Sequence, residues 1–221
     1  MEKTKIFELL KEKIQTIKCS HPIRIGIDGV DAAGKTIFAD DFAKFLQKTG
    51  KQIIRASIDG FHNPKEIRYQ KGQDSPEGYY FDSFNNQAII DLLLKPIGPN
   101  GSLKFRKSIF NYMNNSEVES PIDIAQEDAI LIFDGIFLFR PDLVEYWDLK
   151  IFLDVQFDIT IQRTLKRIKD KKYLGSEQDI LSKYKKRYIP GQKIYLTNVN
   201  PKEKADIVIE NIDFNNPILI K

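Results

Sequence analysis

Residues 29–36 read GVDAAGKT, and their types and spacing suit the binding of phosphate groups. Gly29 and Gly34 permit backbone conformations in which successive N–H groups point at phosphate oxygens. Lys35 would contact the β- and γ-phosphates of a nucleotide, and the hydroxyl of Thr36 would bind Mg²⁺. We predict that one continuous segment holds the phosphates of ATP, namely Gly29, Val30, Asp31, Ala32, Ala33, Gly34, Lys35 and Thr36.

The segments on either side of this phosphate loop (residues 29–36) have the patterns that phosphate binding requires. The run HPIRIGIDG at 21–29 predicts a buried strand, and the apolar residues of 35–48 recur at helical spacing until Gly50. A helix that begins at the loop would add the positive end of its dipole to the site. The alternative is a glycine turn with an incidental lysine, which this order of strand, loop and helix disfavours.

Two aspartates, Asp59 and Asp134, each follow a predicted strand and precede a glycine. Because the carboxyl ends of parallel strands meet at one edge of an open sheet, both side chains could approach the same phosphates. If the protein moves a phosphoryl group to a hydroxyl, one carboxylate would deprotonate that hydroxyl and the other would bind Mg²⁺. The alternative is that each Asp-Gly pair only forms a turn.

The segment 158–172, DITIQRTLKRIKDKK, predicts a helix that could bring cations to the transferred group. Arg163 and Arg167 are four residues apart and share one face, with Lys166 and Lys169 nearby. The alternative is a basic helix face that contacts only solvent.

The order of apolar runs along the chain predicts an α/β fold. Besides the strand before the phosphate loop, we expect strands at 51–59, 129–135, 149–155 and 204–211, and helices at 1–18, 84–97, 140–148 and 177–188. Four or five buried strands separated by helices are typical of a doubly wound parallel sheet with helices on both faces. Residues 98–128 are expected to be irregular, with one or two short strands.

Length and composition suit a single domain spanning 1–221, because 42% of the residues are hydrophobic and 29% are charged. The net charge of +3 is spread along the chain, so we expect a small-molecule partner and no nucleic acid. No apolar run approaches the roughly 18 residues of a membrane span, so no membrane association is expected. Cys19 is the single cysteine and cannot form an internal disulfide, which fits a cytoplasmic protein. A monomer and a homo-oligomer both stay open.

The order of motifs, with GVDAAGKT followed by SIDGFHNP, LIFDGIFLF, IFLDV and ADIVIEN, resembles the uridine kinase-like branch of P-loop kinases, which includes phosphoribulokinase and bacterial pantothenate kinase. The resemblance runs from about residue 23 to 211 and implies a P-loop NTPase-type five-stranded parallel sheet with flanking helices and a small helical lid, here roughly 163–195. It implies ATP and Mg²⁺ as cofactors, Asp59 as the base for the acceptor hydroxyl and Asp134 beside Thr36 at the magnesium. Lys35, Arg163 and Arg167 would then neutralise charge on the transferred group.

The segment 60–83 follows Asp59 and is too long for a tight connection, which favours a functional loop. It resembles the uridine kinase region in which an aspartate contacts the ribose, and also the pantothenate kinase pattern of DGF followed by KG and PE. The segment FNYMNN at 110–115 lacks the histidine that uridine kinases present to the pyrimidine. We expect the acceptor to contact residues of this loop, namely His62, Arg68, Tyr69, Tyr79, Tyr80 and Asp82. In the lid, Arg187 and Lys193 are further candidates for phosphate contacts.

The leading hypothesis is an ATP- and Mg²⁺-dependent kinase that phosphorylates a hydroxyl of a nucleoside. Pantothenate or a sugar phosphate is the alternative acceptor, and the loop KEIRYQK at 65–71 has the cations that a sugar phosphate needs. A nucleotide-switch protein would need a guanine-reading N/T-K-x-D segment, which this sequence lacks. A catalytically idle nucleotide-binding protein is disfavoured because the candidate catalytic residues are all present.

Overall fold

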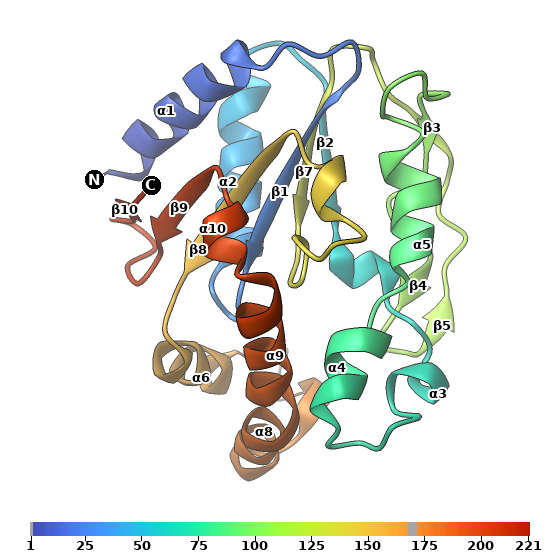
Figure 1. Ribbon diagram of the computed structural model, residues 1–221, viewed down its shortest axis with the longest axis vertical. Coiled ribbons are helices and arrows are strands. Elements are labelled where there is room, and N and C mark those ends of the chain that lie inside the picture. The colour runs from blue at the N-terminus through green and yellow to red at the C-terminus, as the bar shows by residue number, and fades with distance from the viewer. Residues whose placement is uncertain (1, 168–171) are drawn as a thin grey trace.

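The computed structural model describes residues 2–167 and 172–221 and has a central six-stranded sheet with helices on both sides (Figure 1). The strand order is β10-β9-β8-β1-β7-β2. Five strands are parallel and correspond to the five that the sequence predicts, which confirms the predicted fold: β1 (Ile23–Gly29), β2 (Ile53–Ser57), β7 (Ile130–Asp134), β8 (Leu149–Asp154) and β9 (Ile207–Glu210). The sixth, β10 (Ile218–Leu219), pairs antiparallel with β9 and was not predicted.

The sheet brings the functional segments to one edge. β1 lies between β7 and β8, and its residues are all buried, as expected for a continuous apolar run covered on both faces. Ser57 at the end of β2 is in register with Asp134 at the end of β7. Figure 1 shows α3 (Lys65–Arg68), α4 (Pro76–Asp82), α6 (Phe157–Lys166) and α8 (Glu177–Lys183) beyond this lower end of the sheet.

One face of the sheet is covered by α1 (Lys3–Thr16) and α2 (Lys35–Gln47), whose apolar residues share a core with β1 and β8. Phe7 of α1 packs edge-on against Phe38 of α2, with ring centroids 5.2 Å apart. The predicted apolar face of the first helix is therefore buried against the helix that follows the phosphate loop. The other face is covered by α5 (Asn86–Ile89), the π-helical turn η2 (Ile90–Leu94) and α9 (Ile189–Val199).

Three predictions about the remaining elements need correction or restriction. The helix expected at 140–148 is only a 3₁₀ turn, η3 (Val144–Tyr146). Residues 98–128 hold four strands of two residues each rather than one or two: β3 (Lys104–Phe105), β4 (Phe110–Asn111), β5 (Ser116–Glu117) and β6 (Asp123–Ile124). The helix expected at 158–172 is observed as α6 up to Lys166, and Lys169 lies outside the described residues.

The C-terminal part of the chain is helical, as predicted for 177–188. Helix α8 continues into the π-helical segment η4 (Tyr184–Tyr188) and then into α9, and the short helix α10 (Pro201–Lys204) leads into β9. Helix α9 packs against α4 from the acceptor loop (residues 60–83). Within the two described ranges, the helices are too short or too polar to cross a membrane.

Candidate active site

A cavity of about 620 Å³ lies at the carboxyl edge of the sheet. Its wall combines residues of the phosphate loop, the ends of β2 and β7, the acceptor loop and the C-terminal helices. The predicted site residues that line it are Asp31, Ala32, Gly34, Lys35, Thr36, Asp59, His62, Arg68, Tyr69, Tyr79, Asp134, Arg167 and Arg187. Segments more than 100 residues apart in the sequence thus meet around one space.

The phosphate loop has the backbone conformation that its glycines allow. Gly34 immediately precedes α2 and is left-handed, with φ at 93°, a conformation that a residue with a Cβ rarely adopts. A Cβ at this position would also lie 2.3 Å from Cε1 of Phe214. Among the described residues, no side chain caps the N-terminus of α2. The first turn of this helix therefore presents its N–H groups and its dipole to the cavity.

Lys35 is buried and its ammonium group donates a hydrogen bond of 2.8 Å to the carbonyl of Val30 in the same loop. Burial lowers the pKa of Lys35, and the negative charges of Asp31, Asp28 and Asp134 act in the opposite direction. A bound phosphate would add further negative charge beside this ammonium. The position suits Lys35 to the charge-neutralising role that the sequence predicts.

Thr36 and Asp134 are adjacent, as a magnesium site at a phosphate loop requires. The Thr36 hydroxyl donates to Oδ2 of Asp134 at 2.7 Å, and Arg55 donates to Oδ1 at 2.8 Å. In the described part of the chain, no three potential metal-ligating side chains form a cluster. Because Mg²⁺ usually takes one or two carboxylates together with substrate phosphates and water, one hydroxyl and one carboxylate beside a phosphate loop fit this ion.

Asp59 lies in the 3₁₀ turn η1 (Ile58–Phe61) that follows β2, and its side chain is on the cavity wall. Ser57 holds the turn, because its hydroxyl accepts a hydrogen bond of 3.4 Å from the backbone N–H of Asp59. The residue is exposed, so an acceptor entering the cavity can contact it. His62, one turn further on, lies between the rings of Phe84 and Tyr112, with centroids 4.5 and 4.6 Å away.

Several predicted site residues do not line the cavity. The guanidinium of Arg163 donates to the carbonyls of Ala32 at 3.2 Å and Asn211 at 2.7 Å, so it contacts the back of the phosphate loop. Tyr80 is buried in the core with Arg140 over its ring, and Asp82 pairs with Lys71 at 2.8 Å. The other predicted residues absent from the wall are Gly29, Val30 and Ala33, which belong to the phosphate loop itself, and Lys193, which is exposed on α9.

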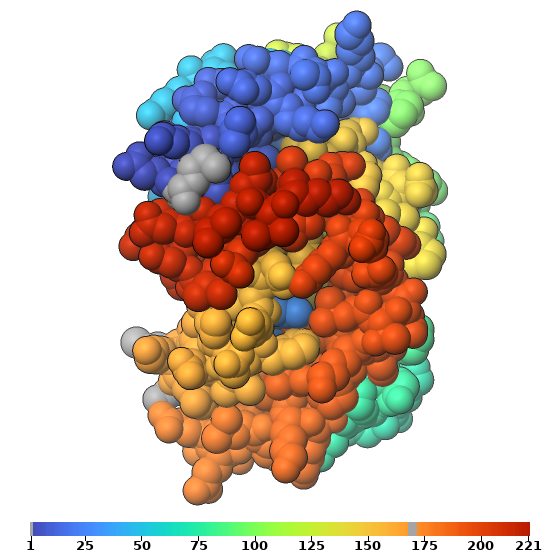
Figure 2. Space-filling view, turned by 60° about the vertical axis from the view of Figure 1, so that its left-hand side comes forward, coloured from blue at the N-terminus to red at the C-terminus, as the bar shows by residue number. Residues whose placement is uncertain are grey.

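Three residues that the sequence did not single out connect the C-terminal helices to the phosphate loop and to the end of β1. The side-chain oxygen of Gln192 accepts a hydrogen bond of 2.6 Å from the N–H of Asp31, and Tyr184 donates to the Asp31 carboxylate. Tyr195 donates to Asp28 at the end of β1. In Figure 2, only a small area of blue atoms from the early part of the chain is visible between the yellow-orange and orange-red segments. Tyr184, Gln192 and Tyr195 are spaced by eight and three residues, which places them on one helix face. This spacing is a sequence signal that could have found them.

The buried carboxyl of Asp28 should make the free energy of unfolding depend on pH. Burial raises the pKa of Asp28 to about 6, against the lowering effects of its hydrogen bond from Tyr195, of the Gly29 N–H and of Lys35. Because the folded-state pKa lies above the ordinary value, the ionised carboxylate costs roughly 3 kcal/mol above pH 6, and the cost disappears as the pH falls toward 4. We expect Asp28→Asn to raise the free energy of unfolding at pH 7.5 and to raise it by about half as much at pH 5, as urea titrations would measure. Equal changes at the two pH values would contradict this account.

The strand, phosphate loop and helix at the edge of a parallel sheet, together with two strand-end aspartates on one cavity, define the class of P-loop kinase folds. The chain belongs to the Phosphoribulokinase / Uridine kinase family, whose model matches residues 24–216. Membership makes it a small-molecule kinase, that is, a phosphotransferase.

Individual relatives agree with this assignment. Uridine-cytidine kinase B of Dictyostelium discoideum is 27% identical over 202 residues, which cover 90% of this chain and 78% of the relative. A uridine kinase of Clostridium botulinum is 31% identical over 150 residues, covering 66% of this chain and 68% of the relative. A solved structure from Bacillus stearothermophilus, described as a "Possible Uridine Kinase", superposes with a TM-score of 0.72 over 91% of this chain and 96% of that chain, at 19% identity, which supports the fold.

Proposed function

We propose that this protein uses ATP and Mg²⁺ to transfer the γ-phosphoryl group to a hydroxyl of a small-molecule acceptor. The observation that carries the proposal is that Lys35, Thr36, Asp134 and Asp59 line one cavity, although they come from three separate strand ends. Phosphoryl transfer needs a group that binds the phosphates, a magnesium ligand and a base for the acceptor, and these four residues supply all three.

In this mechanism the phosphate loop binds the nucleotide phosphates through its N–H groups and Lys35. Thr36 and Asp134 would hold Mg²⁺, which would neutralise negative charge on the nucleotide phosphates. Asp59 accepts the proton of the acceptor hydroxyl. The hydroxyl oxygen attacks the γ-phosphorus, and ADP leaves. Arg167 lines the same cavity and would stabilise negative charge on the transferred group, whereas Arg163 holds the backbone of the loop.

The experiment is a coupled ADP-release assay with Mg-ATP and a panel of uridine, cytidine, other nucleosides, pantothenate, ribulose 5-phosphate and simple sugars. Lys35→Ala serves as the blank, because loss of the ammonium removes the main side-chain cation of the phosphate loop. We expect one acceptor class to raise ADP release well above the rate without acceptor, and the blank to show no such increase. ADP release that no acceptor changes, or that the blank reproduces, would contradict the proposed function.

Nucleosides head the panel because the named relatives are uridine kinases and a uridine-cytidine kinase. The acceptor loop favours a second class of acceptor, one that carries an anionic group. It differs from a site for an uncharged nucleoside because Arg68, and Arg187 beside it, are buried charges.

A further inference from the structure

Arg68 ends helix α3 in the acceptor loop and lines the cavity with only 4% of its surface exposed. Its Nη1 donates to the hydroxyl of Tyr173 at 3.1 Å. Its Nε and Nη2 are buried, and in the described part of the chain neither has a hydrogen-bond partner. These two nitrogens form one edge of the planar guanidinium, the edge that binds both oxygens of a carboxylate or phosphate at once.

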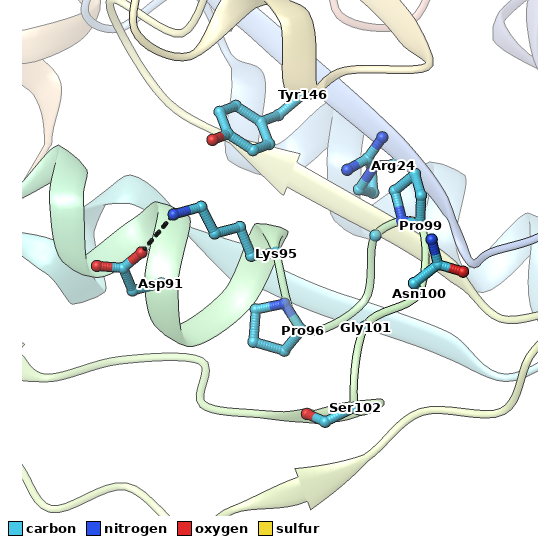
Figure 3. A pocket seen from close by; sticks show the side chains of 10 residues that line it. Arg24, Asp91, Lys95, Pro96, Pro99, Asn100, Gly101, Ser102 and Tyr146 are labelled. Carbon is cyan, nitrogen blue, oxygen red and sulfur yellow. Dashed lines mark hydrogen bonds and ion pairs between the residues drawn. The ribbon is translucent and has the colours of Figure 1, made fainter.

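Arg24 of the same protein has this Nε–Nη2 edge paired with a carboxylate, and it serves as a comparison for Arg68. It is 5% exposed, and its Nε and Nη2 donate to the two carboxylate oxygens of Asp148, both at 3.1 Å. Arg24 lines a second cavity, of about 440 Å³, near the start of β1, where Lys95 also points at its partner Asp91 (Figure 3). Both cations of that cavity are neutralised by the protein. Arg68 is equally buried, yet no described carboxylate pairs with it.

A second buried arginine lies beside Arg68. Arg187 is 1% exposed, and it donates to the backbone carbonyls of Arg68 at 2.7 Å and Ser75 at 3.0 Å, so it holds the acceptor loop in place. Both guanidinium groups lie near the Tyr69 ring, at 5.6 Å for Arg68 and 4.6 Å for Arg187. The carbonyls that accept from Arg187 and the aromatic face of Tyr69 do not neutralise two positive charges, and burying such charges without an anion is costly.

We propose that the phosphate acceptor carries an anionic group, a carboxylate or a phosphate, and that Arg68 binds it through Nε and Nη2. This inference rests on the proposed kinase function and specifies its acceptor as a hydroxy acid or a sugar phosphate rather than an uncharged nucleoside. The anion would neutralise the buried pair Arg68 and Arg187, while the hydroxyl is presented to Asp59 on the same cavity wall. The carboxylate of Asp59 cannot itself bind an anionic group, so the charges orient the acceptor.

The test measures binding separately from turnover. The protein is first saturated with Mg²⁺ and a non-hydrolysable ATP analogue, so that the phosphate loop is filled. Calorimetry then compares matched acceptors: ribose 5-phosphate with ribose for the phosphate, glycerate with glycerol for the carboxylate, and ribulose 5-phosphate, pantothenate and uridine alongside. We expect an anionic compound to bind, and Arg68→Met to weaken its binding by roughly 30-fold or more, while the neutral counterpart binds weakly to both proteins.

Lys71→Met is the matched control. Lys71 carries the same charge in the same loop, but its side chain is 45% exposed and pairs with Asp82. We expect this control to change anion binding by less than about threefold, because Lys71 is half exposed to solvent and its charge is already paired with Asp82. Arg68→Lys keeps the charge but loses the two-nitrogen edge, so it should restore only part of the binding. Thermal unfolding should show that Arg68→Met is as stable as the wild type or more so, since it removes a buried charge without a partner.

The outcomes separate this inference from the proposed function. The inference is wrong if no anionic compound binds more tightly than its neutral counterpart, or if Arg68→Met binds anions as tightly as the wild type does. Arg68-dependent anion binding without acceptor-dependent ADP release would keep the anion site and reject the kinase function. ADP release with uridine that Arg68→Met leaves unchanged would keep the kinase function and reject the anionic acceptor.

Discussion

Asp59→Asn is expected to leave nucleotide binding nearly unchanged and to lower turnover by roughly two to four powers of ten, the usual contribution of a general base. The side chain stands on the cavity wall at the end of β2, and it is exposed to the space that an acceptor would enter. An asparagine has almost the same shape but cannot accept the hydroxyl proton. The rate should be measured by ADP release with the best acceptor, and binding with a fluorescent ADP analogue.

Asp74→Asn is a suitable control for Asp59→Asn. Asp74 lies in the acceptor loop, is about half exposed and pairs with Lys186 at 3.5 Å. The substitution removes one negative charge from the same loop, and the Asp74→Asn variant should retain nearly the full rate of turnover. Full turnover by Asp59→Asn would remove Asp59 as the base, whereas loss of nucleotide binding would mean that the substitution disturbs the phosphate loop.

Asp134→Asn is expected to lower turnover by roughly two to three powers of ten, because it removes the only strand-end carboxylate that contacts Thr36 in the described part of the chain. Removing a metal-binding carboxylate should also raise the Mg²⁺ concentration for half-maximal rate by roughly 10- to 100-fold. A magnesium titration of the initial rate, at saturating ATP and acceptor, measures both effects. The second effect distinguishes a metal ligand from a residue that only supports the fold.

Arg55 makes a separate control necessary for Asp134. It donates to Asp134 at 2.8 Å and also pairs with Asp40 at 2.9 Å, so Asp134→Asn disturbs this pairing as well as the metal site. Asp40→Asn breaks only the outer, half-exposed pair and should leave the magnesium titration unchanged. An equal shift in both variants would mean that Arg55, rather than a lost metal ligand, causes the effect.

The family assignment and the buried arginines concern different properties of the protein. The family model matches residues 24–216, and in the proposed function the motifs of this stretch serve the nucleotide and the transfer step. In the proposed function the acceptor contacts the loop at 60–83, which directly follows Asp59. Loops of this kind vary within a fold without altering its chemistry, so a uridine kinase-like chain can carry a binding site for a different acceptor.

Local sequence patterns were sufficient for the phosphate loop and the five parallel strands. A glycine-rich turn before a helix and a continuous apolar run depend on neighbouring residues, and their conformations are largely determined by backbone sterics and burial. The same reasoning placed Asp59 and Asp134 at strand ends, and the sheet brings both to the cavity. The edge strand β10 was not predictable in this way, because two residues form a strand only through their pairing with β9.

The direction of each side chain in the site was decided by tertiary packing. Arg163 and Arg167 share a helix face in the sequence pattern, yet Arg163 contacts loop carbonyls while Arg167 lines the cavity. Arg68 and Arg187 are 119 residues apart, and no local pattern indicates that the second holds the backbone of the first. By itself the sequence determined which chemistry is present and at which edge of the sheet it lies. Only the tertiary structure decided which charges line the cavity, because burial and hydrogen-bond partners come from segments remote in the chain.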